Sequence, residues 1–311
     1  MDDGLLPDTK SALATLPEAR TAMRSCFRIV ISRIATLGLT VLMGGLLTAV
    51  LVRFSPGFLV DERELDPRLD EASRRSIELE HSANQNVLAF YAKRLERMVL
   101  HADLGDSPSL NRPISQLFQE RFPVTAQLMA IGIAGGWALA FALALPSVMC
   151  RSRIFHGLAA TFHQILMCLP AAAMALLVFD IGGPVRALVA LVICPRIFEY
   201  LRNLLEEAYA QPHILTARAK GADGGRILVH HVLPSVAPQL LALAGVSVSI
   251  AFGAAIPVEV LCDLPGIGQL AWKAATARDL PLLVTITFVV IVMTQVCNTV
   301  SDWAGFRARQ V

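Results

Sequence analysis

The sequence predicts an all-α membrane protein with about six transmembrane helices, a cytoplasmic loop of short helices and an extracytoplasmic insertion after the first helix. Three observations support this fold class. The 311 residues are 55% hydrophobic and only 17% charged, whereas soluble domains carry about a quarter charged residues. Apolar runs long enough to cross a bilayer recur along the chain. Short basic segments lie beside these runs, which is the topology signal of a membrane protein.

The first membrane helix is predicted at residues 29–53. Residues 1–28 are polar and contain several basic side chains, which indicates a cytoplasmic tail. The apolar run that follows is too long for the core of a cleavable signal peptide, and no clear small-residue cleavage site comes after it. We therefore expect a permanent helix, in which Arg33 is close enough to the end to snorkel to the interface.

Residues 54–123 form the one long polar segment and are assigned to the insertion. They begin with a mixed-charge stretch, which we interpret as a solvated surface. An amphipathic helix is expected at Val87–Leu100, because its apolar residues recur near one helical face. A loop of this length can be translocated whatever charges it carries, so its charges do not argue against an extracytoplasmic position.

The remaining membrane core is assigned to residues 124–304, with a cytoplasmic tail at 305–311. Five apolar runs are expected in it, at 126–150, 158–181, 185–198, 239–258 and 282–300. The run at 185–198 is the weakest, because it contains Arg186, Pro195 and Arg196 and is followed by Glu199. Basic residues cluster before the first of the six runs and after the second, fourth and sixth. If the helices alternate, the positive-inside rule places both termini in the cytoplasm.

The loop at 202–238 contains the longest basic segment of the second half, Leu215–Pro238. Gly221 is expected to end one short helix there, since glycine takes a left-handed backbone conformation without cost. Asp223 can cap a second short helix, which Leu233-Pro234 would end at Val232. Two short helices joined at a glycine on a membrane surface suit docking better than catalysis.

Ala217, Gly221, Leu233 and Pro234 fall at the spacing of the EAA motif. By this motif the chain resembles permease subunits of ABC importers, and its His231 is similar to the variant in dipeptide, oligopeptide and nickel permeases. The sequence departs from the motif at Leu215, where the name-giving Glu would stand. The resemblance implies a coupling helix that sits in a groove of a separate ATPase subunit. The implied contact residues are Thr216, Ala217, Arg218, Ala219, Lys220, Gly221, Ala222, His231, Leu233 and Pro234.

A second match lies at Glu259–Leu270, EVLCDLPGIGQL, which resembles "VExVFxLPGLGxL" of the same family. Two glycines and a proline within five residues prevent a continuous helix, so we expect a short re-entrant or interfacial element. The candidate pathway or gate residues are His163, Glu259, Leu264, Pro265, Gly266 and Gly268. For His163 a packed, hydrogen-bonded role is the alternative, and for Glu259 a solvated or ion-paired structural role.

The resemblance covers most of residues 29–300 and implies one half of the translocation pathway of an ATP-driven importer of peptides or similar small solutes. It implies a prokaryotic plasma (inner) membrane location, surrounded by membrane lipid. The implied partners are a second, similar permease subunit, two ATPase subunits and an extracytoplasmic substrate-binding protein. No nucleic acid partner is expected, because no dense Lys/Arg block with interleaved aromatics occurs.

No catalytic, metal or cofactor site is expected in this chain. It contains no GxxxxGK[ST], HExxH or GxSxG motif, so ATP would bind the partner ATPases. Two alternatives remain open. A secondary transporter would need coupling-ion groups in its spans, preferably on broken helices of inverted repeats. A subunit that docks an ATPase without transporting is compatible with the short 181–185 connection and the altered C-terminal tail.

Overall fold

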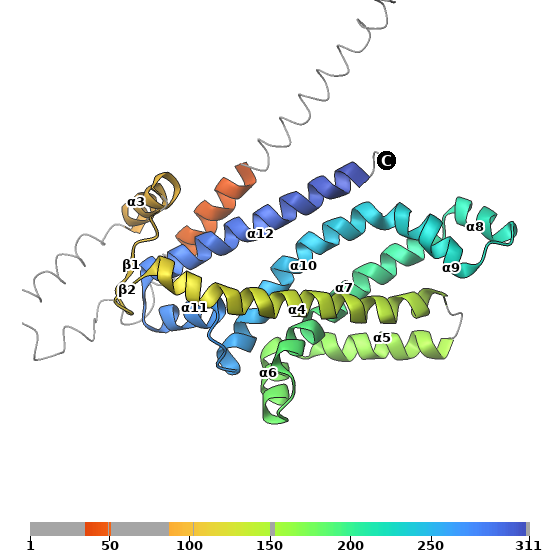
Figure 1. Cartoon of the computed structure of the whole chain (residues 1–311), viewed down its shortest axis with the longest axis horizontal. Coiled ribbons are helices and arrows are strands. Elements are labelled where there is room, and N and C mark those ends of the chain that lie inside the picture. The colour runs from red at the N-terminus through yellow and green to blue at the C-terminus, as the bar shows by residue number, and fades with distance from the viewer. Residues whose placement is uncertain (1–34, 49, 51–86, 102, 150–152, 309–311) are drawn as a thin grey trace, which may run out of the picture.

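The computed structural model describes residues 35–48, 50, 87–101, 103–149 and 153–308, and Figure 1 shows their arrangement. The predictions for 1–28, for the ends of the first helix and for most of the insertion lie outside these residues. Within the described residues, the only sheet is a two-residue antiparallel pairing of β1 (Asp106–Ser107) with β2 (Arg112–Pro113). The all-α fold class is confirmed.

The helices follow one another along the described chain as follows: an apolar helix Ala35–Thr48, α3 (Val87–Leu100), α4 (Ile114–Met149), α5 (Arg153–Cys168), α6 (Ala171–Asp180), α7 (Val185–Tyr209), α8 (Pro212–Ala219), α9 (Gly224–Ile227), the π-helical turn η1 (Leu228–Val232), α10 (Leu233–Leu261), α11 (Ile267–Thr276) and α12 (Leu280–Ala308). The amphipathic helix predicted at Val87–Leu100 is α3.

Three helical segments in the described part are long and apolar enough to cross a membrane: α4, the continuous segment Gly224–Leu261, and α12. Helices α5 and α6 pass the same criterion together but are bent by 96°. The apolar run predicted at 158–181 therefore forms two helices joined by a bend. Pro170 lies at the bend with extended backbone (ψ 142°), because proline has no amide hydrogen to continue the helical ladder. The count of six spans stays a prediction.

Helix α4 starts earlier than the apolar run predicted at 126–150. It begins at Ile114 and passes through Pro123, so the boundary that we placed between residues 123 and 124 lies inside a helix. The first turns of α4 are polar, and they form one continuous helix with the apolar part that follows. The last run likewise extends on both sides of 282–300, as α12.

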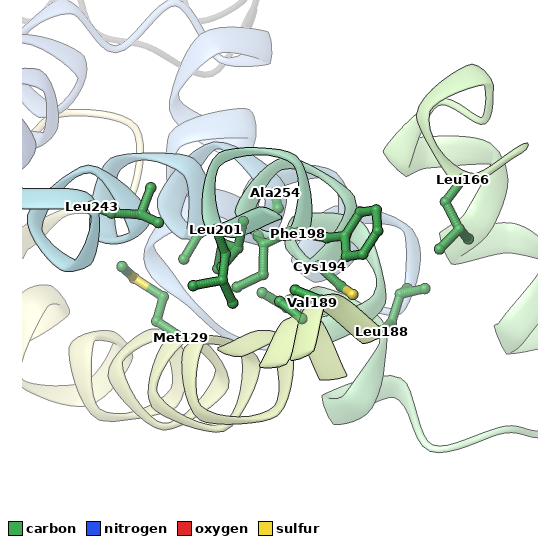
Figure 2. Packing of buried hydrophobic residues seen from close by; sticks show 14 of the residues in the cluster. Met129, Leu166, Leu188, Val189, Cys194, Phe198, Leu201, Leu243 and Ala254 are labelled. Atoms are coloured by element: carbon green, nitrogen blue, oxygen red, sulfur yellow. The ribbon is translucent and has the colours of Figure 1, made fainter. Parts of the chain in front are cut away.

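Helix α7 lies at the centre of the bundle, although its sequence gave the weakest membrane signal. Its buried side chains include Val189, Ile193 and Leu201, each 0% exposed. Figure 2 shows Val189 and Leu201 between α4 and α10, with Leu166 of α5 nearby. The close approach of α4 depends on glycine, since a Cβ atom at Gly132 would lie 2.4 Å from Val189 Cγ1. Small residues permit such backbone contacts between membrane helices.

The two segments with motif matches lie at opposite ends of the bundle (Figure 1). Helices α8 and α9 form one end, beyond the last turn of α7 and the first turns of α10. Helix α11 and the β1–β2 hairpin form the other end. The long helices α4, α10 and α12 connect these ends.

Candidate functional site

The end of helix α8 is fixed by backbone hydrogen bonds around Gly221. The amide of Gly221 donates to the carbonyl of Arg218 at 3.0 Å, and the amide of Ala222 donates to Ala217 at 3.2 Å. This pair of bonds is the Schellman arrangement, which needs a left-handed residue just after the helix. Gly221 supplies it with φ of +80°. The predicted stop at Gly221 is confirmed, and the carbonyl of the EAA-motif residue Ala217 accepts the hydrogen bond from Ala222.

Asp223 caps the next helix, as predicted. Its carboxylate accepts a hydrogen bond from the Gly225 amide at 3.1 Å, and its backbone is extended (φ −63°, ψ 150°). Side-chain capping of this kind satisfies a backbone donor that has no partner inside the helix.

The second helix does not end at Leu233-Pro234, and that prediction is wrong. Helix α9, the turn η1 and α10 form one continuous helical segment, Gly224–Leu261. The π turn Leu228–Val232 directly precedes Pro234, which lies in the first turn of α10. A π turn interrupts the regular i→i−4 ladder, so the missing proline amide is tolerated at this place.

These elements present one face to solvent and one to the bundle, and we call the exposed face the coupling surface. Ile214 and Ile227 are 0% and 2% exposed and anchor the two short helices in the core. The coupling surface consists of the exposed residues Leu215, Thr216, Arg218, Ala219, Lys220, Gly221, Arg226, Val229, His231 and Pro234. Ala217, Ala222 and Leu233 are half-buried beneath it. The surface is thus basic with an apolar component.

We expect Asp223→Ala to loosen the start of α9 with only a small effect on the whole chain. Losing a side-chain cap typically costs about 0.5–2 kcal/mol. Hydrogen exchange at the Gly225 amide should become faster, whereas Asp223→Ser, which keeps an acceptor oxygen, should stay close to the unmodified chain. Equal exchange rates in all three proteins would show that the cap does not hold this turn.

At the opposite end, Glu259 holds the start of helix α11. It is 0% exposed, and its Oε2 atom accepts hydrogen bonds from the amides of Gly268 at 2.6 Å and Gln269 at 3.3 Å. The amide of Ile267 donates to Thr125 Oγ1 of α4 at 2.7 Å. The first three amides of α11 are therefore capped by side chains from α10 and α4, because the N-cap residue Gly266 has none to offer.

The glycines of this turn make room for the carboxylate. A Cβ atom at Gly266 would lie 2.2 Å from the Glu259 carboxyl carbon, and one at Gly268 would lie 2.7 Å from Ile256 Cα. Leu264 and Pro265 complete the turn between α10 and α11. The predicted interruption of the helix is confirmed. Glu259 is buried rather than solvated, and it makes no ion pair with the described residues; its role here is to cap a helix, which differs from the solvated or ion-paired alternative that we had considered.

The start of helix α12 is tied to the hairpin by Asp279. Its carboxylate accepts hydrogen bonds from the Leu282 amide at 2.9 Å and from the Ser109 hydroxyl at 2.7 Å, and also from the Ser107 hydroxyl. Arg94 of α3 donates to Thr285 Oγ1 at 3.2 Å and to the Leu104 carbonyl. Burial lowers the pKa of this guanidinium, which nevertheless stays charged. These contacts join α3, the hairpin and α12 at one end of the bundle.

The candidate pathway residues do not form one site. Glu259, Leu264, Pro265, Gly266 and Gly268 lie together between α10 and α11, whereas His163 belongs to α5. The imidazole of His163 packs on Phe198, with ring centroids 5.5 Å apart, and its Nε2 atom lies 3.8 Å from Glu199 Oε2. His163 is thus packed against α7, as the alternative left open for it expected, but its buried Nε2 atom has no hydrogen-bond partner among the described residues.

The profile of a family described as "Binding-protein-dependent transport system inner membrane component" matches residues 124–306, more than half of the chain. The chain belongs to this family. The matched region spans the bent α5–α6 pair, α7, the coupling surface and the α10–α11 turn. The chain is therefore an inner-membrane component of a transport system, as the resemblance implied.

The permease family assignment agrees with individual relatives. The oligopeptide transport system permease protein AppB of Bacillus subtilis (strain 168) is 25% identical over 308 residues, covering 88% of this chain and 95% of the relative. The oligopeptide transport system permease protein OppB of Escherichia coli (strain K12) is 27% identical over 269 residues, covering 77% and 84%. A solved inward-facing structure of the MetNI methionine ABC transporter has a TM-score of 0.57 at 14% identity, over 62% of this chain and 96% of that chain, and supports the fold.

Sequence reasoning missed three residues of this permease that shape the coupling surface. Ile214 and Ile227 anchor it, and Val229, which is 55% exposed, adds apolar area. Each stands beside another aliphatic residue, in Ile214-Leu215 and in Ile227-Leu228-Val229, so the sequence alone does not say which of these side chains faces the core. Thr125 could not have been found in this way, because its contact with α11 joins positions 142 residues apart.

Proposed function

We propose that this chain is a permease subunit of an ATP-driven importer of peptides or similar small solutes. It forms half of the translocation pathway, together with a second, similar permease subunit. Two separate ATPase subunits bind at the coupling surfaces of the pair, and an extracytoplasmic binding protein delivers the solute. The peptide class follows from the relatives, several of which are named as peptide or oligopeptide permeases.

The observation that carries this proposal is that the segment bearing the coupling surface has one side buried in the bundle and one side exposed to solvent. Ile214 and Ile227 are buried in the bundle core, whereas Leu215 and Val229 are 56% and 55% exposed. Large apolar side chains exposed beside Arg218 and Lys220 suit a protein partner with an apolar, acidic-rimmed groove. Because α8 and α9 lie between α7 and α10 along the chain and are anchored in the core, a displacement of this surface by such a partner would be transmitted to both long helices.

The test is co-purification with candidate ATPase subunits, with Gly221→Pro as the decisive variant. Proline fixes φ near −65°, which is incompatible with the +80° at this position. We expect the unmodified chain to retain the ATPase and the proline variant to lose it, by at least about tenfold, a difference of about 1.4 kcal/mol.

Gly221→Asn is the matched control, since asparagine tolerates the left-handed region better than other residues with a side chain. No heavy atom lies within 4 Å of a Cβ atom at this position, so the comparison isolates backbone conformation. Retention by the asparagine variant and loss by the proline variant, both inserted in the membrane, support docking through this turn. If the unmodified chain captures no ATPase where a known permease does, the importer assignment is wrong.

A further inference from the structure

From Arg196 onward, helix α7 exposes a single face that is entirely polar. Between these positions, Ile197, Phe198 and Leu201 are at most 2% exposed. At about 100° per residue, the exposed positions fall within an arc of about 120° around the helix. We call this arc the α7 polar face; its members are Arg196, Glu199, Tyr200, Asn203, Glu206 and Glu207.

The part of the α7 polar face around Glu199 is expected at the depth of the bilayer core. Helices α4 and α7 run parallel where they touch, because Gly132 meets Val189 and Gly136 meets Ile193. Glu199 follows Ile193 by about 9 Å along the helix, level with the apolar part of α4. It also precedes the end of α7 at Tyr209 by about 15 Å, half the thickness of the hydrocarbon core.

A carboxylate at this depth cannot face lipid without a large free-energy cost, and such groups usually face a water-filled cavity or another polar group. The other exposed surfaces of the bundle are different. Helices α5 and α6 expose mainly large apolar residues, including Phe162, Ile165, Leu176 and Phe179, which suit lipid contact; among the described side chains of these two helices, the exposed polar residues are Thr161, Gln164 and Asp180. The α7 polar face therefore marks the one side of this central helix that is built for water.

We propose that the α7 polar face lines the aqueous translocation pathway and that its carboxylates hold the amino group of the passing solute. This inference rests on the proposed function and adds to it the pathway surface and a chemical class of solute. Glu206 is paired with Arg202 at 2.7 Å. The remaining charges of the face are two carboxylates, Glu199 and Glu207, and one guanidinium, Arg196; Glu199 Oε2 lies 3.8 Å from His163 Nε2, beyond hydrogen-bond distance. The excess is acidic, with Tyr200 and Asn203 between as hydrogen-bonding groups.

Thiol accessibility tests the position of the face, using two positions of equal exposure in the isolated chain. Tyr200 is 57% and Ile165 is 56% exposed. In a full-length chain with its native cysteines replaced by alanine, Tyr200→Cys and Ile165→Cys are treated in membrane vesicles with a charged methanethiosulfonate. Thiolates form and react only where water reaches them, so Tyr200→Cys should be modified at least about tenfold faster. A membrane-permeant maleimide, applied after solubilisation, confirms that both thiols are present.

If Tyr200→Cys reacts no faster than Ile165→Cys, the face does not line an aqueous path and the proposal is overturned. The same vesicles are used to measure ATPase capture. This second readout reports on the proposed function, because capture persists when only the pathway assignment is wrong.

The charge preference is tested at Asn203→Cys, one helical turn from Glu199. A cationic methanethiosulfonate should react faster than an anionic one of similar size. Glu199→Gln should lower the ratio of the two rates about tenfold, because one charge about 6 Å away in water changes each rate about threefold, in opposite directions for the two reagents. The control is Glu120→Gln, which removes a carboxylate in the first turns of α4. An unchanged ratio in Glu199→Gln would rule out the assignment of amino-group binding to this carboxylate.

Discussion

Replacing Glu259 with leucine is expected to release the start of helix α11 and to destabilise the chain by about 2–6 kcal/mol, since each buried amide left without a partner costs about 1–3 kcal/mol. The Gly268 and Gln269 amides would both lose the acceptor that now lies 2.6 Å and 3.3 Å away. Leucine has a similar volume, so the change removes the acceptor without opening a large cavity.

The effect is measured as the thermal unfolding midpoint in detergent and as hydrogen exchange of the α11 amides. Glu259→Gln is the control, because its amide oxygen can still accept one of the two hydrogen bonds. Gly266→Ala provides an independent check, since a Cβ atom would lie 2.2 Å from the carboxyl carbon and would push the same group out of place. Faster exchange in Glu259→Leu and Gly266→Ala, with Glu259→Gln between them and the unmodified chain, is the expected order. Unchanged exchange in Glu259→Leu would contradict the capping role.

The second large effect is expected for Gly132→Ala, which should separate α4 from α7. The added Cβ atom would lie 2.4 Å from Val189 Cγ1 and 2.7 Å from Val189 Cβ. Valine is β-branched and cannot rotate away easily, so the helices must move apart. Overpacking of this kind costs about 1–3 kcal/mol.

Gly253→Ala is the matched control for this contact. Gly253 lies inside α10, and no heavy atom comes within 4 Å of a Cβ atom there. Alanine is favoured over glycine inside a helix by roughly 0.5–1 kcal/mol, so this variant should unfold at the same or a higher temperature. The thermal unfolding midpoints of the two variants should therefore move in opposite directions. Equal shifts would mean that the α4–α7 contact does not decide stability.

Local rules of chain geometry were sufficient for several parts of the structure. The amphipathic helix α3, the stop at Gly221, the cap at Asp223 and the interruption after Glu259 were all predicted from neighbouring residues. Each depends on a preference that acts within a few positions, such as helical periodicity or the left-handed backbone of glycine. The roles of the coupling surface in ATPase docking stay predictions.

Sequence reasoning was weakest where an average along the chain hides which side of a helix is polar, where a helix bends and where a local rule has an exception. Helix α7 gave a weak membrane signal because Arg196 and Glu199 lower its mean hydropathy, yet the structure separates its polar and buried sides. The run at 158–181 has the composition of one span, and only the geometry shows its 96° bend. Pro234 was predicted to end a helix because the rule for proline assumes a regular ladder, which the π turn interrupts.

Because α9, η1 and α10 form one unbroken segment of 38 residues, the coupling surface and the Glu259 cap lie near the two ends of one continuous helical segment. At 1.5 Å per residue this helical segment is about 57 Å long. A tilt of about 3° at one end displaces the other by about 3 Å, roughly the length of a hydrogen bond. If an ATPase docks at α9 as proposed, a small change of angle there is therefore enough, in distance, to make or break the contacts that hold α11.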